Sequence, residues 1–190
     1  MELTNAACVV TGAARGLGAA LARTLAARGA RVLLSGIDDG DLRNLGAALK
    51  QPTMHCNVAK REEVIALARR AIEEFGRIDL WFNNAGVWLP YVPVEELDFN
   101  RAHDLIEINY FGTAYGTVEA LRHMRPHRSG CIVNVLSIRA LKGKELAAAY
   151  CASKFAAEGF TQAVRDELKG TGIRVVGVYP YRMKTSLFDE

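Results

Sequence analysis

The chain has 190 residues, of which 50% are apolar and 24% are charged, a balance typical of a globular protein that buries a hydrophobic core. This length predicts one domain spanning residues 1–190. The net charge of +3 is too small to favour a nucleic-acid binder, and no apolar run approaches the length needed to cross a membrane.

Short β-branched runs alternate with longer helical patterns along the chain. Strands are expected at 6–11, 31–35, 53–57, 79–83, 130–137 and 173–179. Helices are expected at about 17–28, 39–49, 60–75, 98–125 and 146–169. Most of the strands are nearly continuous apolar runs, as is typical of strands buried on both faces of a parallel sheet. The alternation predicts a doubly wound, Rossmann-like α/β fold with strand order 3-2-1-4-5-6 and helices on both faces.

A glycine-rich loop, TGAARGLG at 11–18, directly follows the first predicted strand. Gly12, Gly16 and Gly18 permit a tight turn, a close approach of the backbone to phosphate, and close packing of helix on strand. The next helix then directs its unpaired N–H groups and its positive dipole end at the phosphate. Glycines alone also occur in ordinary turns, but this position between strand and helix favours a dinucleotide site.

The fourth predicted strand ends in Asn83-Asn84-Ala85-Gly86. By itself this stretch is typical of a simple turn. At the carboxyl end of a central strand, however, it should lie beside the predicted cofactor.

The strongest chemical signal is YCASK at 150–154, preceded by Ser137 at the end of the fifth predicted strand. Tyr150 and Lys154 are one helical turn apart and share a face, so both can act on the same atom. A tyrosine with its ordinary pKa of about 10 is a poor base at neutral pH. A nearby ammonium and the positive nicotinamide ring should lower the Tyr150 pKa, while Ser137 holds the substrate oxygen. Such tyrosine–lysine pairs arise often by chance on a buried helix face. A functional role is favoured here because the glycine loop and Ser137 occur in the same chain.

Together these motifs resemble the short-chain dehydrogenase/reductase family, in the branch with a TGxxxGxG loop. The resemblance rests on residues 11–18, 83–86, Asn109, Ser137 and 150–154, and it runs through nearly the whole chain. It implies an oxidoreductase that transfers a hydride between NAD(P)(H) and an alcohol or carbonyl compound, with Tyr150 as general acid and base. The implied catalytic residues are Asn109, Ser137, Tyr150 and Lys154.

In the roles implied by the resemblance, Lys154 holds the nicotinamide ribose and lowers the Tyr150 pKa, Ser137 orients the substrate carbonyl, and Asn109 anchors a water that relays protons from Lys154. The cofactor-binding residues that it implies are Gly12, Arg15, Gly16, Leu17, Gly18, Gly36, Asn57, Val58, Asn84, Ala85, Gly86, Tyr150, Lys154, Pro180, Met183 and Thr185.

Departures from the family pattern bear on the cofactor and the substrate. Members that prefer NAD usually carry an aspartate at the end of the second strand, where this chain has Gly36. Without that carboxylate a 2′-phosphate would not be repelled, and Arg15 in the glycine loop could pair with it. This favours NADP(H) slightly over NAD(H), although Asp38 and Asp39 follow closely. Asn57 replaces the usual aspartate beside the adenine, and Tyr181 replaces a glycine after Pro180.

Family members commonly run about sixty residues further, so the chain is expected to be either a short member or a fragment with a reduced substrate lid. A homodimer through the helices at 98–125 and 146–169 is expected, since the family often pairs these faces.

A second hypothesis for the function is a sensor or scaffold that binds NAD(P) without turnover. A third, a nucleic-acid binder using the basic stretch 122–128, is weak because such runs are usually solvated loops.

The cysteines and histidines predict neither disulfides nor a metal site. The four cysteines contain no CxxC pair, and the first residues lack the features of a signal peptide, which together favour reduced thiols in a cytoplasmic protein. The four histidines show no HExxH or other ligand spacing. We therefore expect a small-molecule enzyme without a metal, a nucleic-acid partner or a membrane segment.

Overall fold

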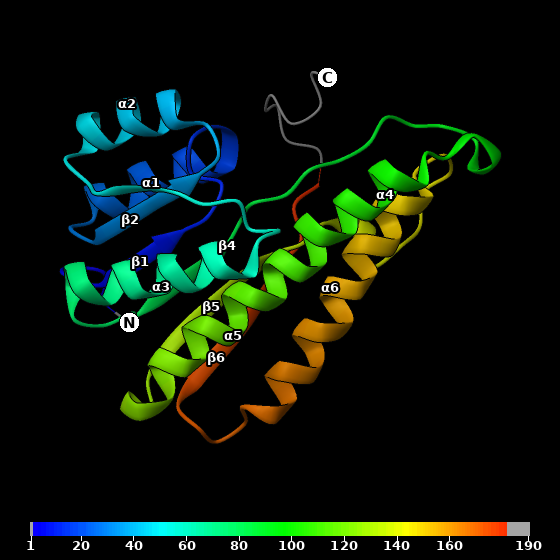
Figure 1. Cartoon of the computed structure of the whole chain (residues 1–190). Coiled ribbons are helices and arrows are strands. Elements are labelled where there is room, and N and C mark those ends of the chain that lie inside the picture. The colour runs from blue at the N-terminus through cyan, green and yellow to red at the C-terminus, as the bar shows by residue number, and fades with distance from the viewer. Residues whose placement is uncertain (1, 182–190) are drawn as a thin grey trace.

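The computed structural model describes residues 2–181, in which strands and helices alternate as predicted (Figure 1). The strands are β1 Ala7–Val10, β2 Arg31–Gly36, β3 Thr53–His55, β4 Leu80–Asn83, β5 Gly130–Val135 and β6 Ile173–Val178. The helices are α1 Gly16–Ala27, α2 Asp39–Leu49, α3 Arg61–Phe75, α4 Phe99–Ile106, α5 Gly112–Met124 and α6 Ala148–Glu167. Short 3-10 turns span Val94–Glu96, Arg125–His127 and Ile138–Ala140.

All six strands form one parallel sheet in the order β3-β2-β1-β4-β5-β6, which confirms the predicted topology. Residues alternate between two apolar clusters, one on each side of the sheet. Val9, Leu33 and Trp81 face a core completed by α3, α5 and α6, whereas Val10 and Leu34 face a core completed by α1 and α2. Helices thus cover both faces, and the carboxyl ends of the strands share one edge of the sheet.

Both β3 and β5 end two residues earlier than predicted, because polar side chains beyond each strand turn the chain out of the sheet. After β3, the Asn57 Oδ1 atom accepts a hydrogen bond of 3.1 Å from the Ala59 N–H, an Asx turn. After β5, the Ser137 Oγ atom accepts one of 3.1 Å from the Arg139 N–H. Asn57 and Ser137 therefore lie in loops just past the strand ends, where ligands meet such sheets.

The prediction of one continuous helix over 98–125 is wrong in its middle. A π-helical turn, Glu107–Phe111, separates α4 from α5 and contains Asn109. The Thr113 hydroxyl donates to the Asn109 carbonyl at 2.9 Å. The first residue of α5 must also be small, because a Cβ on Gly112 would lie 2.7 Å from Val58 Cγ2. A π turn widens one turn within an otherwise continuous helix, and the helical residue preferences from which the element was predicted do not distinguish it from an α-helical turn.

A buried polar network fixes β4 and β5 against α5 and α6. The Asn83 amide accepts from Trp81 Nε1 at 2.7 Å and donates to Asn134 Oδ1 at 2.8 Å. Asn134 in turn donates to Thr161 on α6 at 2.9 Å. Gly116 on α5 leaves room for the Asn83 side chain, since a Cβ at position 116 would lie 2.0 Å from Asn83 Oδ1. This network sets the position of α6, which carries Tyr150 and Lys154, relative to the end of β4.

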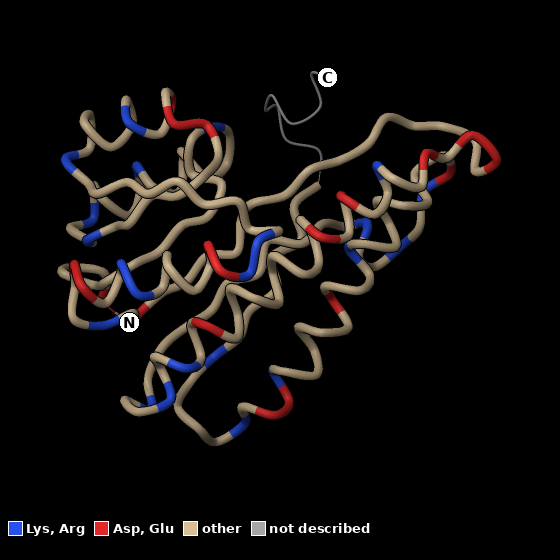
Figure 2. The backbone as a smooth tube through the Cα atoms, viewed as in Figure 1, with Lys and Arg blue, Asp and Glu red and all other residues tan. Residues whose placement is uncertain are grey.

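The surface and the cysteines add three observations. Acidic and basic residues are interspersed along the backbone (Figure 2). None of the helices within residues 2–181 is long and apolar enough to cross a membrane. All four cysteines are free and buried.

Candidate active site

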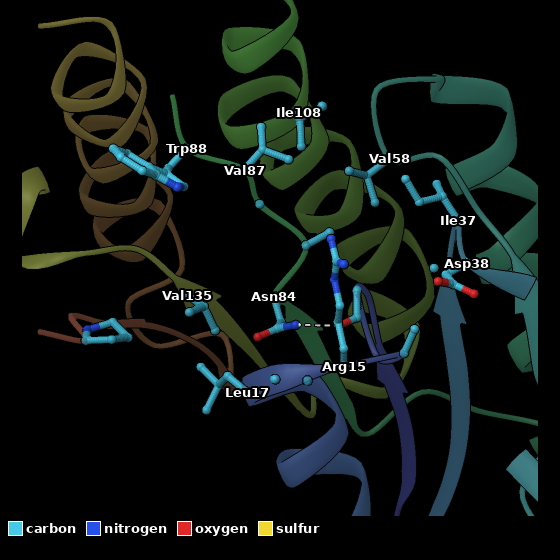
Figure 3. A pocket seen from close by; sticks show the side chains of 18 of the residues that line it. Arg15, Leu17, Ile37, Asp38, Val58, Asn84, Val87, Trp88, Ile108 and Val135 are labelled. Carbon is cyan, nitrogen blue, oxygen red and sulfur yellow. Dashed lines mark hydrogen bonds between the residues drawn. The ribbon is translucent and has the colours of Figure 1, made fainter. Parts of the chain in front are cut away.

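A pocket of about 690 Å³ lies at the carboxyl ends of the strands, between the glycine loop and the start of α6. Figure 3 shows its walls, with Ile37 and Asp38 at one end and Trp88 at the other. Of the residues predicted to be catalytic or to bind the cofactor, the pocket is lined by Gly12, Arg15, Gly16, Leu17, Gly18, Gly36, Asn57, Val58, Asn84, Ala85, Gly86, Ser137, Tyr150, Lys154 and Pro180.

The glycine loop takes the form that its three glycines permit. Gly12 and Gly16 adopt left-handed backbone angles, with φ of +60° and +56°. Gly18 allows the close packing of α1 on β1, because a Cβ there would lie 2.1 Å from the Gly12 carbonyl oxygen. The Asn84 Nδ2 atom donates to the carbonyls of Thr11 at 2.8 Å and Gly12 at 3.1 Å, which ties the loop to the end of β4 (Figure 3).

The N-terminus of α1 opens on this loop and suits an anion. Its N-cap residue, Arg15, makes no side-chain cap hydrogen bond, and the first turn carries no acidic residue. The first N–H groups and the positive dipole end of the helix therefore face the pocket without an internal carboxylate as competitor. A dinucleotide pyrophosphate fits these donors and the space that the glycines leave.

The adenosine end of the pocket combines apolar walls with carboxylates that have other contacts. Ile37 and Val58 project into this end (Figure 3). Gly36 also lines the pocket. The Asp38 Oδ1 atom caps α2 by accepting from the Asp41 N–H at 3.0 Å, and Asp39 Oδ1 lies 3.0 Å from His55 Nδ1.

At the other end, Ser137, Tyr150 and Lys154 converge from the loop after β5 and from α6. Lys154 Nζ lies 5.9 Å from the centre of the Tyr150 ring, as expected for residues one helical turn apart. The Ser137 hydroxyl acts on the Tyr150 phenol and lowers its pKa. The pocket thus brings together a phenol, an alcohol and an amine, the three side chains that the sequence singles out.

Burial sets the protonation of Lys154. The side chain is 5% exposed, and its Nζ atom donates to the Val135 carbonyl at 3.3 Å. Burial lowers the pKa of the amine from its ordinary value to about 8. Gly86 leaves the space in front of it open, because a Cβ there would lie 3.5 Å from Lys154 Nζ and 3.1 Å from Asn109 Oδ1.

The expected lowering of the Tyr150 pKa is not found among the protein groups alone. Burial raises the pKa of this phenol, and the neighbouring Cys151 raises it further, whereas the Ser137 hydroxyl and the charge of Arg139 lower it. The amine of Lys154 donates to the Val135 carbonyl. Burial also lowers the pKa of this amine, so a smaller fraction of it is charged. Desolvation therefore outweighs the nearby cations, and the neutral phenol is the favoured form in the protein by itself.

The profile of short chain dehydrogenases matches residues 6–190. The chain belongs to the short chain dehydrogenase family. It is similar to cis-4-hydroxycyclohexanecarboxylate dehydrogenase from Sinomonas cyclohexanicum, with 38% identity over 184 residues that cover 94% of this chain and 74% of the relative.

Solved structures of this family superpose closely on the chain. A short chain dehydrogenase/reductase from Burkholderia phymatum in complex with NAD gives a TM-score of 0.96 at 28% identity, over 100% of this chain and 70% of the other. Levodione reductase gives a TM-score of 0.94 at 30% identity, over 97% of this chain and 74% of the other. The chain is therefore an NAD(P)-dependent oxidoreductase of the short chain dehydrogenase family.

Asn109, which the family resemblance places in the catalytic set, does not line the pocket. It is completely buried behind the pocket wall. Its Oδ1 atom accepts from the Val87 N–H at 2.9 Å, and its Nδ2 atom donates to the Val87 carbonyl at 2.8 Å and to Ser153 Oγ at 3.1 Å. In this structure the amide of Asn109, which lies in the π turn, holds the chain segment that follows Gly86.

The segment after β6 is described as far as Tyr181. Pro180 and Tyr181 both line the pocket, and the Pro180 carbonyl accepts from the Ile138 N–H at 3.1 Å. Tyr181, at 69% exposure, adds an aromatic ring to the mouth of the pocket. Met183 and Thr185, also predicted to bind the cofactor, lie outside the described residues.

Sequence reasoning missed Thr11 as a residue of the site. Its hydroxyl donates to the Phe82 carbonyl at 3.2 Å and accepts from the N–H groups of Asn84 and Ala85, each at 3.0 Å. It thereby joins the ends of β1 and β4 beneath the pocket. The sequence feature that could have revealed Thr11 is its position as the first residue of the glycine motif at 11–18, in which only the glycines were assigned a function. The further pocket-lining residues without a predicted cofactor role are Ala14, Ile37, Asp38, Asp39, Cys56, Val87, Trp88, Ile108, Val135, Leu136 and Tyr181.

Proposed function

We propose that the protein interconverts a secondary alcohol and its carbonyl compound, with Tyr150 transferring the hydroxyl proton. The observation that carries this proposal is the convergence of Ser137, Tyr150 and Lys154 at one end of a pocket whose other parts fit a dinucleotide. The name of the relative from Sinomonas cyclohexanicum, a dehydrogenase of a cyclic hydroxy acid, supports an alcohol as the substrate.

The proton step follows from the protein's own groups. In reduction, the Tyr150 hydroxyl donates its proton to the substrate oxygen as the carbonyl carbon receives the hydride, and in oxidation it takes the alcohol proton back. The raised pKa of Tyr150 keeps it protonated at neutral pH, so it is ready to act as an acid. Ser137 holds the substrate oxygen beside the phenol by a second hydrogen bond.

The cofactor is held by groups along the rest of the pocket. Bound NAD(P)H supplies the hydride, and NAD(P)⁺ accepts it. The glycine loop and the α1 N-terminus take the pyrophosphate, Ile37 and Val58 take the adenine, and Lys154 donates to the nicotinamide ribose hydroxyls. Because Lys154 lies on the same helix as Tyr150, the bound ribose and the phenol are positioned together.

A slight preference for NADP(H) over NAD(H) is part of the proposal. Gly36 offers no carboxylate to the ribose 2′-hydroxyl, and Arg15 lines the same pocket. The Asp38 and Asp39 carboxylates nearby are engaged with the α2 N-terminus and with His55. A 2′-phosphate would therefore meet less repulsion here than beside an aspartate at position 36.

We also propose a homodimer paired through α5 and α6, which lie side by side in Figure 1. Val118 on α5 is 39% exposed and Phe155 on α6 is 46% exposed, so each helix presents an apolar side chain outward. Light scattering after size exclusion checks the mass, and Phe155→Glu should shift it to that of a monomer.

The Tyr150→Phe variant tests the proposed function. It removes one oxygen while keeping the ring, so NAD(P)H binding should persist while kcat falls about 100- to 10,000-fold. The measurement is NADPH and NADH consumption with a panel of ketones, aldehydes and quinones, alongside calorimetric titration of the cofactor. Tyr115→Phe, on α5 and outside the pocket lining, is the matched control and should keep full activity.

Two outcomes would contradict the proposal. Equal turnover by the wild type and by Tyr150→Phe would remove Tyr150 from the chemistry. Cofactor binding by the wild type without turnover of any substrate would favour the alternative of an NAD(P)-binding sensor or scaffold.

A further inference from the structure

The end of the pocket that holds Trp88 lies beyond the proposed cofactor site and is available to the substrate. Figure 3 shows Trp88 at the opposite end of the pocket from Ile37 and Asp38, on the segment that leaves the end of β4. Trp88 is half-buried and lines the same pocket as Ser137 and Tyr150. An indole at that end contacts whatever carries the reacting carbon rather than the adenosine.

The backbone that carries Trp88 is held on both sides. Before it, both backbone groups of Val87 bond to the buried Asn109 amide, at 2.9 and 2.8 Å. After it, the Val92 N–H donates to the Leu146 carbonyl at 3.0 Å, which ties the segment to the loop preceding α6. The chain from Val87 to Val92, termed here the tryptophan segment, is thereby fixed to the π turn and to the loop that precedes α6, the helix that carries Tyr150 and Lys154.

The Trp88 ring has an aromatic brace. Its centre lies 5.1 Å from that of the Tyr91 ring, at an interplanar angle of 68°, an edge-to-face contact. Such a contact restrains the orientation of the indole. Tyr91 itself is 52% exposed and does not line the pocket, so its contribution acts through Trp88.

We propose that Trp88 determines substrate specificity and selects secondary alcohols or ketones whose reacting carbon belongs to, or is attached to, an apolar ring. The proposal rests on the proposed function, in which Ser137 and Tyr150 hold the substrate oxygen. With the oxygen fixed, a flat or ring-shaped body packs on the rigid indole and loses little internal freedom. An open chain of similar size buries less area on a flat wall and loses rotamer entropy on binding.

The first test compares two ketones, cyclohexanone and the acyclic 3-pentanone, in the wild type and in Trp88→Ala. Loss of the indole should lower kcat/KM for cyclohexanone about 30-fold, chiefly through KM, and change that for 3-pentanone by less than about threefold. The Kd for NAD(P)H should stay unchanged. Phe99→Ala, which removes an aromatic ring that is 78% exposed on α4, is the matched control and should leave both ketones unaffected.

An equal loss for both ketones would overturn the inference while leaving the proposed function intact. The same holds if Trp88→Ala leaves both values unchanged. If the wild type reduces no ketone, the proposed function fails, and the binding measurement that follows decides the inference alone.

The second test reads binding without turnover. The chain has two tryptophans, and Trp81 is fully buried, with its Nε1 bonded to Asn83 at 2.7 Å. Titration of cyclohexanol into the complex with NADP⁺ in the Tyr150→Phe background should therefore change the emission of Trp88. The same titration of the Trp88→Phe, Tyr150→Phe double variant should give no change. An identical change of emission in the single and the double variant would show that cyclohexanol binds away from Trp88, and it would overturn the inference.

Tyr91 is a positioning residue in this proposal, and its variants should separate bracing from simple structure. Tyr91→Phe keeps the ring edge and should preserve the preference for cyclohexanone. Tyr91→Ala removes the brace and should raise KM for cyclohexanone without changing kcat for 3-pentanone. If Tyr91→Ala changed kcat for both ketones, Tyr91 would not act by restraining the Trp88 ring, and its role as a positioning residue would be wrong.

Discussion

The two ends of the pocket are built in different ways. The phosphate end is made mostly of backbone: Gly12 and Gly16 in left-handed conformations, Gly18 against the Gly12 carbonyl, and the N–H groups of α1. The reaction end is made of side chains, with Ser137, Tyr150 and Trp88 carried by three separate stretches of chain. A backbone site tolerates no added atoms, whereas a side-chain site tolerates substitution but depends on burial and charge. The two ends should therefore respond to different changes.

For binding of the cofactor, the largest effect is expected at the phosphate end, from Gly18→Ala. The added Cβ would lie 2.1 Å from the Gly12 carbonyl oxygen and 2.6 Å from Asn84 Nδ2, so the loop must shift. Overpacking of this kind costs about 1–3 kcal/mol of stability, and NAD(P)H affinity should fall by about tenfold or more. Denaturant unfolding and calorimetry measure the two quantities.

Gly159→Ala is the matched control for that variant. Gly159 lies within α6, and an added Cβ meets nothing within 4 Å among the described residues. It should stabilise the protein by up to about 1 kcal/mol, since alanine favours the helix. Normal cofactor affinity in Gly18→Ala would show that the phosphate end is not a backbone site.

At the reaction end, pH should separate the two directions of the reaction. Because the Tyr150 pKa is raised, the phenol is protonated at neutral pH, so reduction should stay level there and fall only in alkali. Oxidation needs the phenolate and should rise with pH. Lys154, with a pKa of about 8, loses its charge above that pH and with it some affinity for the ribose. Initial rates and cofactor Kd from about pH 6 to 10 measure these trends.

Lys154→Arg sharpens the pH comparison, because a guanidinium does not titrate in this range. The change in cofactor affinity near pH 8 should disappear in this variant. Persistence of the same change would assign it to another group.

The smallest expected effect is at the adenosine end, from Gly36→Asp. The nearest described atom to a Cβ at this position is Ala14 Cβ at 3.8 Å, so the side chain has room. A carboxylate there repels a 2′-phosphate and accepts from a 2′-hydroxyl, and the ratio of the Kd values for NADPH and NADH should rise about tenfold. Calorimetric titration with both cofactors measures the ratio. Gly40→Asp adds the same charge outside the pocket and should leave the ratio unchanged.

The family, the sheet order and most of the site could be predicted because their causes are local. Left-handed turns need glycine at particular positions, and the Tyr150–Lys154 spacing follows from helical geometry. The π turn at Glu107–Phe111 and the role of Thr11 could not be predicted. Each depends on contacts between residues far apart in the chain, such as Thr11 with Asn84 and Asn109 with Val87.

The sequence by itself determined the parallel α/β fold, the glycine loop and the identity of the residues that meet at the strand ends. Only the tertiary structure decided their environment. The direction of the Tyr150 pKa, the enclosure of Asn109 and the half-buried position of Trp88 in the pocket wall depend on how deeply α6 and the tryptophan segment are packed. Spacing along the chain fixes which groups are near one another, but desolvation and orientation arise from neighbours that only the folded chain brings into contact.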